Sequence, residues 1–163
     1  MGKVTLSERT LIRHSCSPEE TQALATNLGQ RLRVGDFVAL CGPLGAGKTV
    51  FVQGLAAGLP VAGPVTSPTF IIIRYHPGPV PLCHADAYRI STANELEAAG
   101  LTEAAEEAVV ALEWADKVRE IWPNQVYIVQ LEYDNTARRI EVIGRGEGPA
   151  SVIQELKDAY FRD

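Results

Sequence analysis

The stretch FVALCGPLGAGKTVF, residues 37–51, indicates the fold, because it reads as a buried strand, a glycine-rich loop and the start of a helix. Residues 37–41 are all apolar, which is typical of a strand inside a parallel sheet. Residues 42–49 fit the pattern G-x-x-x-x-G-K-[ST] at every position. A strand before this pattern and a helix after it are the context in which such a loop binds a nucleoside triphosphate. The stretch therefore predicts a P-loop with a Walker A motif.

The loop residues have predicted roles that follow from this mechanism. Gly45 and Gly47 let the backbone approach phosphate, and successive amides at the start of the helix form an anion cradle. Lys48 is expected to reach the β- and γ-phosphates and to be catalytic, and the Thr49 hydroxyl is expected to bind Mg²⁺. Pro43 has no N–H, but it precedes the amides that face the phosphates, so it removes no essential donor. The predicted nucleotide-binding residues of this segment are Pro43, Leu44, Gly45, Ala46, Gly47, Lys48, Thr49 and Val50.

The rest of the chain alternates strand and helix signals. Ser17 and Pro18 predict the start of a helix, with Glu20 completing a capping box. Asp134 and Asn135 lie between two alternating stretches and predict an antiparallel hairpin. Strands are expected over 4–12, 37–41, 70–75, 82–88, 108–112, 125–133 and 138–143, and helices over 18–32, 50–58, 91–99, 114–121 and 150–161. The pattern predicts an α/β, three-layer P-loop NTPase-like fold with a mixed parallel and antiparallel sheet.

Length and composition restrict the class of protein. A chain of 163 residues, 46% hydrophobic and 21% charged, predicts one domain over residues 1–163. No apolar run approaches the roughly 20 residues that span a membrane, and we expect no secretory signal. Three widely spaced cysteines predict a reducing, cytoplasmic environment rather than a disulfide framework or zinc site. A net charge of −5 without a basic block indicates that any contact with nucleic acid runs through partners.

Two carboxylates end apolar strands and are candidates for the acid that a P-loop needs near Mg²⁺. Glu113 follows AVVAL and is favoured as the metal ligand, while Asp86 ends PLCHAD and is expected to orient water or sense phosphate. Both are predicted to be catalytic, and their order of distance from the metal stays open. The chain has no N-K-x-D or T-K-x-D motif for reading guanine, so ATP is the expected nucleotide.

Three further stretches carry a resemblance: TSPTF (66–70), HADAYR (84–89) and LEW (112–114). Together with GPLGAGKT they resemble the TsaE family of small bacterial P-loop ATPases, and the similarity extends from 17–25 through 94–101 to the late hairpin. The resemblance implies slow Mg²⁺-dependent ATP hydrolysis that resets a TsaB–TsaD-type transferase heterodimer, which makes threonylcarbamoyladenosine (t6A) at position 37 of tRNA. Such a protein would contact tRNA only through that complex.

The resemblance also implies roles for particular residues. Trp114 matches a residue near the nucleotide, and Thr69 is the expected polar contact of a switch-type loop beside the γ-phosphate. Pro43 departs from the family, whose loop usually carries an acidic residue there. Apart from the resemblance, His84 is expected to be a packed or hydrogen-bonded strand histidine rather than a base, and Arg89 is the one candidate within the chain for an arginine finger.

Two other functions are compatible with the sequence. A small-molecule P-loop kinase has this size, but it needs an arginine-rich lid, and the chain's arginines are scattered at Arg74, Arg89, Arg138 and Arg139. A non-enzymatic module that holds nucleotide as a structural ligand would bind through Lys48 but would not need Asp86 or Glu113.

Overall fold

The computed structural model describes residues 7–67 and 72–161, and its centre is one mixed sheet of seven strands. The strand order is β1-β7-β6-β2-β5-β4-β3. Strands β4, β5, β2 and β6 are mutually parallel, and β3, β7 and β1 join the two edges antiparallel. Their bounds are β1 Glu8–Ser15, β2 Phe37–Cys41, β3 Ile73–His76, β4 Leu82–Asp86, β5 Val109–Glu113, β6 Val126–Asp134 and β7 Ala137–Arg145.

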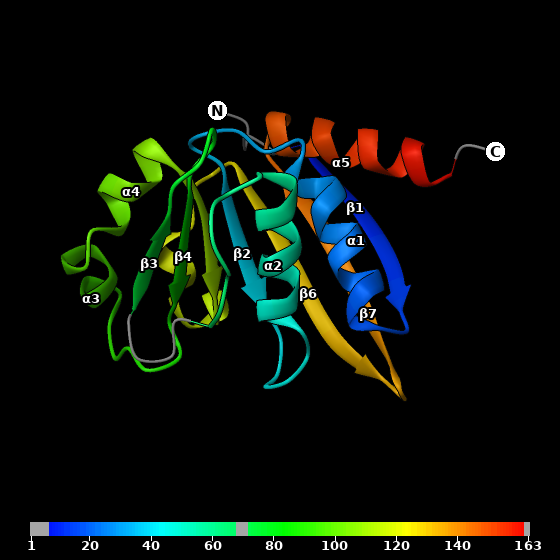
Figure 1. Cartoon of the computed structure of the whole chain (residues 1–163), viewed down its shortest axis with the longest axis horizontal. Coiled ribbons are helices and arrows are strands. Elements are labelled where there is room, and N and C mark those ends of the chain that lie inside the picture. The colour runs from blue at the N-terminus through cyan, green and yellow to red at the C-terminus, as the bar shows by residue number, and fades with distance from the viewer. Residues whose placement is uncertain (1–6, 68–71, 162–163) are drawn as a thin grey trace, which may run out of the picture.

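Helices cover both faces of this sheet and complete a three-layer α/β architecture (Figure 1). On one face, α1 (Pro18–Gly29), α2 (Lys48–Gly58) and α5 (Glu147–Tyr160) bury apolar side chains against the strands. On the other face, α3 (Ala93–Ala98), α4 (Leu101–Glu107) and the 3-10 segment η1 (Ala115–Ile121) enclose a second core. The predicted fold class, with its mixed sheet, is confirmed.

Small residues bring α1 and α2 into close contact where they lie side by side in front of the sheet (Figure 1). A Cβ on Gly54 of α2 would lie 2.5 Å from the Gln22 carbonyl oxygen and 2.5 Å from the Ala25 Cβ of α1. A Cβ on Gly29 of α1 would lie 2.5 Å from the Leu55 carbonyl oxygen. The glycines therefore set the spacing of the two helices, and with it the position of the loop that enters α2.

Most element boundaries agree with the sequence patterns, and the differences have local reasons. Helix α1 begins as predicted: the Glu20 N–H donates to Ser17 Oγ, and the Glu20 carboxylate accepts from the Cys16 N–H. Helix α2 begins at Lys48 rather than residue 50, because helical geometry starts directly after Gly47. The first strand, Glu8–Ser15, continues past the expected end at residue 12, because its whole length pairs with β7. Residues 4–6 of the expected strand lie outside the described residues.

The parallel strands bring three chain segments to one edge of the sheet. Strands β2, β4 and β5 end at Cys41, Asp86 and Glu113, and Asp86 lies opposite Glu113 in the β4–β5 register. Because these are the carboxyl ends of parallel strands, the loop after β2 and both predicted acids meet at this edge, where open α/β sheets bind ligands. No helix within residues 7–67 and 72–161 is both long and apolar enough to span a membrane.

Candidate functional site

The loop between β2 and α2 is shaped by positive φ angles and by the neighbouring hairpin. Gly42 has a φ of 146°, and a Cβ there would lie 2.4 Å from the Leu131 carbonyl oxygen of β6. Gly45 has a φ of 77°, and a Cβ there would lie 2.7 Å from the Tyr133 hydroxyl. That hydroxyl donates a hydrogen bond of 2.5 Å to the Leu44 carbonyl. Packing against β6 therefore selects glycine at both positions.

The first turn of α2 leaves its amides available to an anion. Gly47 is the N-cap, no side chain caps the helix among the described residues, and the first turn contains no acid. The first N–H groups of a helix have no partner within the helix, and the helix dipole favours negative charge beside them. The geometry fits the predicted phosphate cradle.

Lys48 is buried inside this loop. Its Nζ donates to the carbonyl oxygens of Gly42 at 2.6 Å and Pro43 at 2.9 Å, and it lies 3.9 Å from the centroid of the Trp114 ring. Burial lowers the pKa of Lys48, and the nearby carboxylates of Glu113, Asp116 and Asp86 oppose that shift. The carbonyls and the indole hold the ammonium group at the carboxyl edge of the sheet.

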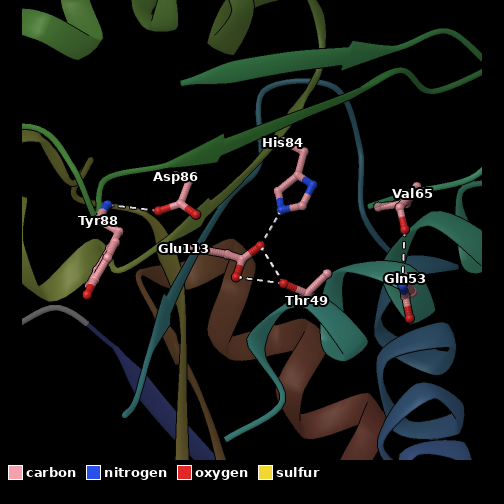
Figure 2. A network of polar contacts seen from close by, with 7 residues as sticks. All are labelled: Thr49, Gln53, Val65, His84, Asp86, Tyr88 and Glu113. Carbon is pink, nitrogen blue, oxygen red and sulfur yellow. Dashed lines mark hydrogen bonds and ion pairs between the residues drawn. The ribbon is translucent and has the colours of Figure 1, made fainter. Parts of the chain in front are cut away.

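Thr49 and Glu113 meet at the start of α2 (Figure 2). The Thr49 hydroxyl lies 3.0 Å and 3.1 Å from the two carboxylate oxygens of Glu113. Glu113 is only 3% exposed, and its Oε2 lies 2.5 Å from Nε2 of His84, which is fully buried on β4. His84 is thus a packed and hydrogen-bonded strand residue, as its position predicted.

Asp86 lies beside Glu113 on the neighbouring strand but has a different partner (Figure 2). Its carboxylate accepts the Tyr88 N–H at 2.8 Å. Burial raises the pKa of Asp86, and this hydrogen bond lowers it in part. Of the two acids, Glu113 is the one in contact with the Thr49 hydroxyl.

Trp114 follows Glu113 with a φ of 57°, which is unusual for a bulky residue. This conformation turns the chain into η1, and the indole ring is in contact with both the Lys48 ammonium group and the Tyr88 ring. The Tyr88 and Trp114 ring centroids are 4.8 Å apart, and Lys117 Nζ donates to the Tyr88 carbonyl at 2.5 Å. The aromatic pair therefore forms one wall beside the Lys48 ammonium group.

An open pocket of about 340 Å³ lies over these groups. It is lined by Leu44, Gly45, Gly47, Lys48, Thr49, Val50, Ser67, Asp86, Tyr88, Glu113 and Trp114. The structure thus brings together most of the sequence-predicted site residues. Ala46 is buried within the loop, and Thr69 lies outside the described residues. Arg89 is exposed and does not line this pocket.

A second pocket, of about 160 Å³, lies against the same loop. It is lined by residues 15–18 and Thr21 from the turn into α1, by Gly45, Ala46, Gly47 and Val50, and by Thr136 and Arg138 from the β6–β7 hairpin. The sequence patterns identified none of the hairpin residues that approach the loop. The pairing of β6 with β2 places these hairpin residues beside the loop, and no local sequence motif indicates that pairing.

The donor set fits magnesium shared with phosphate. A hydroxyl oxygen and a carboxylate are ligands that Mg²⁺ prefers, and Mg²⁺ commonly binds one or two carboxylates plus phosphate oxygens and waters. Within residues 7–67 and 72–161, no group of three or more His, Cys, Asp or Glu side chains could hold a metal ion by itself. Thr49 and Glu113 would therefore supply the protein's share of such a site.

Comparisons with known proteins agree on one family. A family model described as threonylcarbamoyl adenosine biosynthesis protein TsaE matches residues 15–140. A protein of Bacillus subtilis (strain 168) named tRNA threonylcarbamoyladenosine biosynthesis protein TsaE is 42% identical over 143 residues, covering 86% of this chain and 89% of that protein. A protein of the same name from Streptomyces coelicolor is 42% identical over 134 residues, covering 76% and 90%.

A solved structure has the same architecture. The crystal structure of YdiB from Bacillus subtilis superposes with a TM-score of 0.80 at 29% sequence identity, covering 94% of this chain and 98% of that one.

Proposed function

The chain belongs to the TsaE family of threonylcarbamoyl adenosine biosynthesis proteins, and from this premise we propose that it binds ATP with Mg²⁺ and hydrolyses it slowly. ATP turnover resets a TsaB–TsaD-type transferase heterodimer between cycles of t6A formation on tRNA. The protein meets tRNA through that complex and works in the cytoplasm, where its three free cysteines stay reduced.

The contact between Thr49 and Glu113 carries this proposal. A hydroxyl at the start of the P-loop helix and a buried carboxylate at the end of a neighbouring strand, 3.0 Å apart, are the pair that P-loop NTPases use to hold Mg²⁺. Thr49 and Glu113 would hold Mg²⁺ there, and the ion, when bound, would supply positive charge beside the terminal phosphates. A phosphate-binding loop with a structural role alone would not require a buried acid at this hydroxyl.

The other residues position the phosphates and the attacking water. Lys48 exchanges its Gly42 and Pro43 carbonyl partners for phosphate oxygens, which keeps its ammonium group hydrogen-bonded throughout. The amides of residues 45–49 donate to the phosphates. Asp86 lines the same pocket, and its pKa is raised. It orients the attacking water or accepts a proton from it. Trp114 covers the lysine and shields that side of the site.

The same pocket supports slow turnover in isolation. Among its described lining residues Lys48 is the only cation, and none is an arginine. An arginine that reaches the transferring phosphate speeds hydrolysis by about 10³–10⁵-fold in GTPases. A partner that contributes a cation to this pocket could therefore increase the rate of hydrolysis by a large factor.

The second pocket suggests where the nucleoside lies. The 340 Å³ pocket contains Lys48, Thr49 and Glu113 and takes the terminal phosphates. The 160 Å³ pocket touches the loop beside Arg138 and takes the base and ribose. A nucleotide in this orientation crosses Gly45 and Gly47, which line both pockets.

The proposal is tested by association with the transferase heterodimer, with and without ATP, and by t6A content in a deletion strain carrying variants. Glu113→Ala and Asp86→Ala are expected to bind ATP but to fail in hydrolysis and t6A formation. Lys48→Ala is expected to lose binding as well. Glu120→Ala, at an exposed acid of η1, is the matched control. ATP-independent association together with normal t6A in the deletion strain would refute the proposal.

A further inference from the structure

His84 is a buried residue that contacts Glu113 but does not line the pocket. Its side chain is fully buried on β4, and its Nε2 lies 2.5 Å from Glu113 Oε2. The pocket that contains Lys48 and Thr49 is lined by Asp86 from the same strand but not by His84. Because His84 does not reach the pocket, it cannot exchange protons with nucleotide or water there. Any role it has is exerted through Glu113.

The direction of the hydrogen bond follows from the second ring nitrogen. His84 Nδ1 is buried and has no hydrogen-bond partner among the described residues. A buried N–H without an acceptor costs its full desolvation penalty, so the ring proton is placed on the nitrogen that has a partner. Nε2–H therefore donates to Glu113 Oε2, and Nδ1 remains an acceptor.

This bond fixes the orientation of the carboxylate. Glu113 can rotate about its own side-chain torsions, and its Oε1 and Oε2 lie 3.0 Å and 3.1 Å from the Thr49 hydroxyl. With Oε2 held by His84, rotation that withdraws Oε1 from Thr49 breaks a charge-assisted bond in a buried site. His84 lies on β4 and Glu113 on β5, so two paired strands rather than a loop set the geometry.

We propose that His84 is a positioning residue, which holds Glu113 through Nε2–H so that the carboxylate stays beside the Thr49 hydroxyl, within reach of a bound Mg²⁺. The proposal rests on the Mg²⁺ site of the proposed function. Outer groups that orient a metal ligand typically contribute about 10–100-fold in metal affinity or activity. His84 is accordingly expected to affect Mg²⁺-dependent binding more than the binding of nucleotide alone.

The test compares His84→Gln, His84→Asn and His84→Ala by calorimetry with ADP, in the presence of Mg²⁺ and in the presence of EDTA. A glutamine amide can place its donor near the position of Nε2, whereas an asparagine amide is one methylene shorter. We expect His84→Ala and His84→Asn to weaken the Mg²⁺-dependent component about 10–100-fold, and His84→Gln to restore most of it. ADP binding in EDTA should be the same for all three. His76→Asn, at another buried histidine on the same side of the sheet, is the matched control.

A second readout does not depend on any ligand. The chain has three histidines, so nitrogen-15 spectra of the imidazole rings can be assigned by the His14, His76 and His84 variants. The His84 ring is expected to carry a proton on Nε2, the nitrogen that faces Glu113. A ring with its proton on Nδ1 alone overturns the inference.

The outcomes separate this inference from the proposed function. If the wild-type protein binds ADP equally with Mg²⁺ and with EDTA, the Mg²⁺ site itself is wrong. If the wild type depends on Mg²⁺ and His84→Ala retains that dependence, the inference on His84 is wrong while the site stands. If all three variants weaken binding alike, including in EDTA, His84 supports packing only, and the inference is also overturned.

Discussion

Replacing Gly54 by alanine should destabilise the protein, although alanine is the better helix former. In the interior of an exposed helix, this change would stabilise by about 1 kcal/mol. Here the new Cβ would lie 2.5 Å from the Gln22 carbonyl oxygen and 2.5 Å from the Ala25 Cβ. Forcing an extra carbon into such a contact costs about 1–3 kcal/mol. Displacing α1 would also stretch the bond of 3.1 Å from Thr26 Oγ1 to the Gly54 carbonyl, worth about 1 kcal/mol.

These contributions sum to a net loss of about 1–3 kcal/mol for Gly54→Ala, or a fall in melting temperature of about 3–9 °C for a chain of this size. Urea unfolding gives the free energy, with Ala57→Gly at an exposed position of α2 as the control. That control should lose about 1 kcal/mol through helix propensity alone. Because α2 begins at Lys48, ADP affinity should also fall in Gly54→Ala but not in the control.

A gain in stability for Gly54→Ala, equal and opposite to the loss in Ala57→Gly, would refute this reasoning. It would show that helix propensity dominates and that the α1–α2 spacing can relax without strain. Unchanged ADP affinity alongside the predicted loss would leave the packing argument intact but would separate it from the position of the loop.

Two further predictions concern the paired acids. The pKa of Asp86 is raised above its ordinary 3.8, so its contribution to stability is fully present below pH 3.8 and is lost as the pH rises through the raised value. Asp86→Asn should therefore be more stable than the wild type at neutral pH but not near pH 3.8. If urea unfolding gave the same difference in free energy between the two proteins at both pH values, it would contradict this. Glu113→Gln keeps an acceptor for His84, whereas Glu113→Ala leaves a buried donor unpaired and should lose about 1–3 kcal/mol more. Melting curves that rank the two variants in the opposite order would count against the hydrogen bond between His84 and Glu113. Neither variant should hydrolyse ATP.

The sequence predicted the parts of the site that depend on local patterns. The phosphate loop follows from its glycine spacing, and Glu113 and Asp86 follow from acids that end apolar runs. Parallel pairing of β4, β5 and β2 then brings those acids to the loop, as the rule for open α/β sheets predicts.

The contacts that depend on pairing between distant strands could not be predicted from local sequence patterns. Nothing near Tyr133 or Arg138 in the sequence indicates that β6 lies next to β2, so their approach to the loop was missed. The His84–Glu113 bond likewise needs the register of two strands and the side-chain torsions of both residues. The boundary of α2 depends on a glycine in left-handed geometry, which propensity does not locate to the residue.

The two contacts between the β6 strand and the glycine loop have a consequence for how the motif itself is interpreted. Gly42 and Gly45 each lack a side chain at a place where the protein's own chain, at Leu131 and Tyr133, already fills the space. Part of this nucleotide signature is thus a requirement of folding, satisfied before any ligand is bound. A substitution at either glycine would disturb the contact between the loop and the hairpin. If such a variant failed to bind nucleotide, the cause could be impaired folding of the protein as much as lost recognition of phosphate.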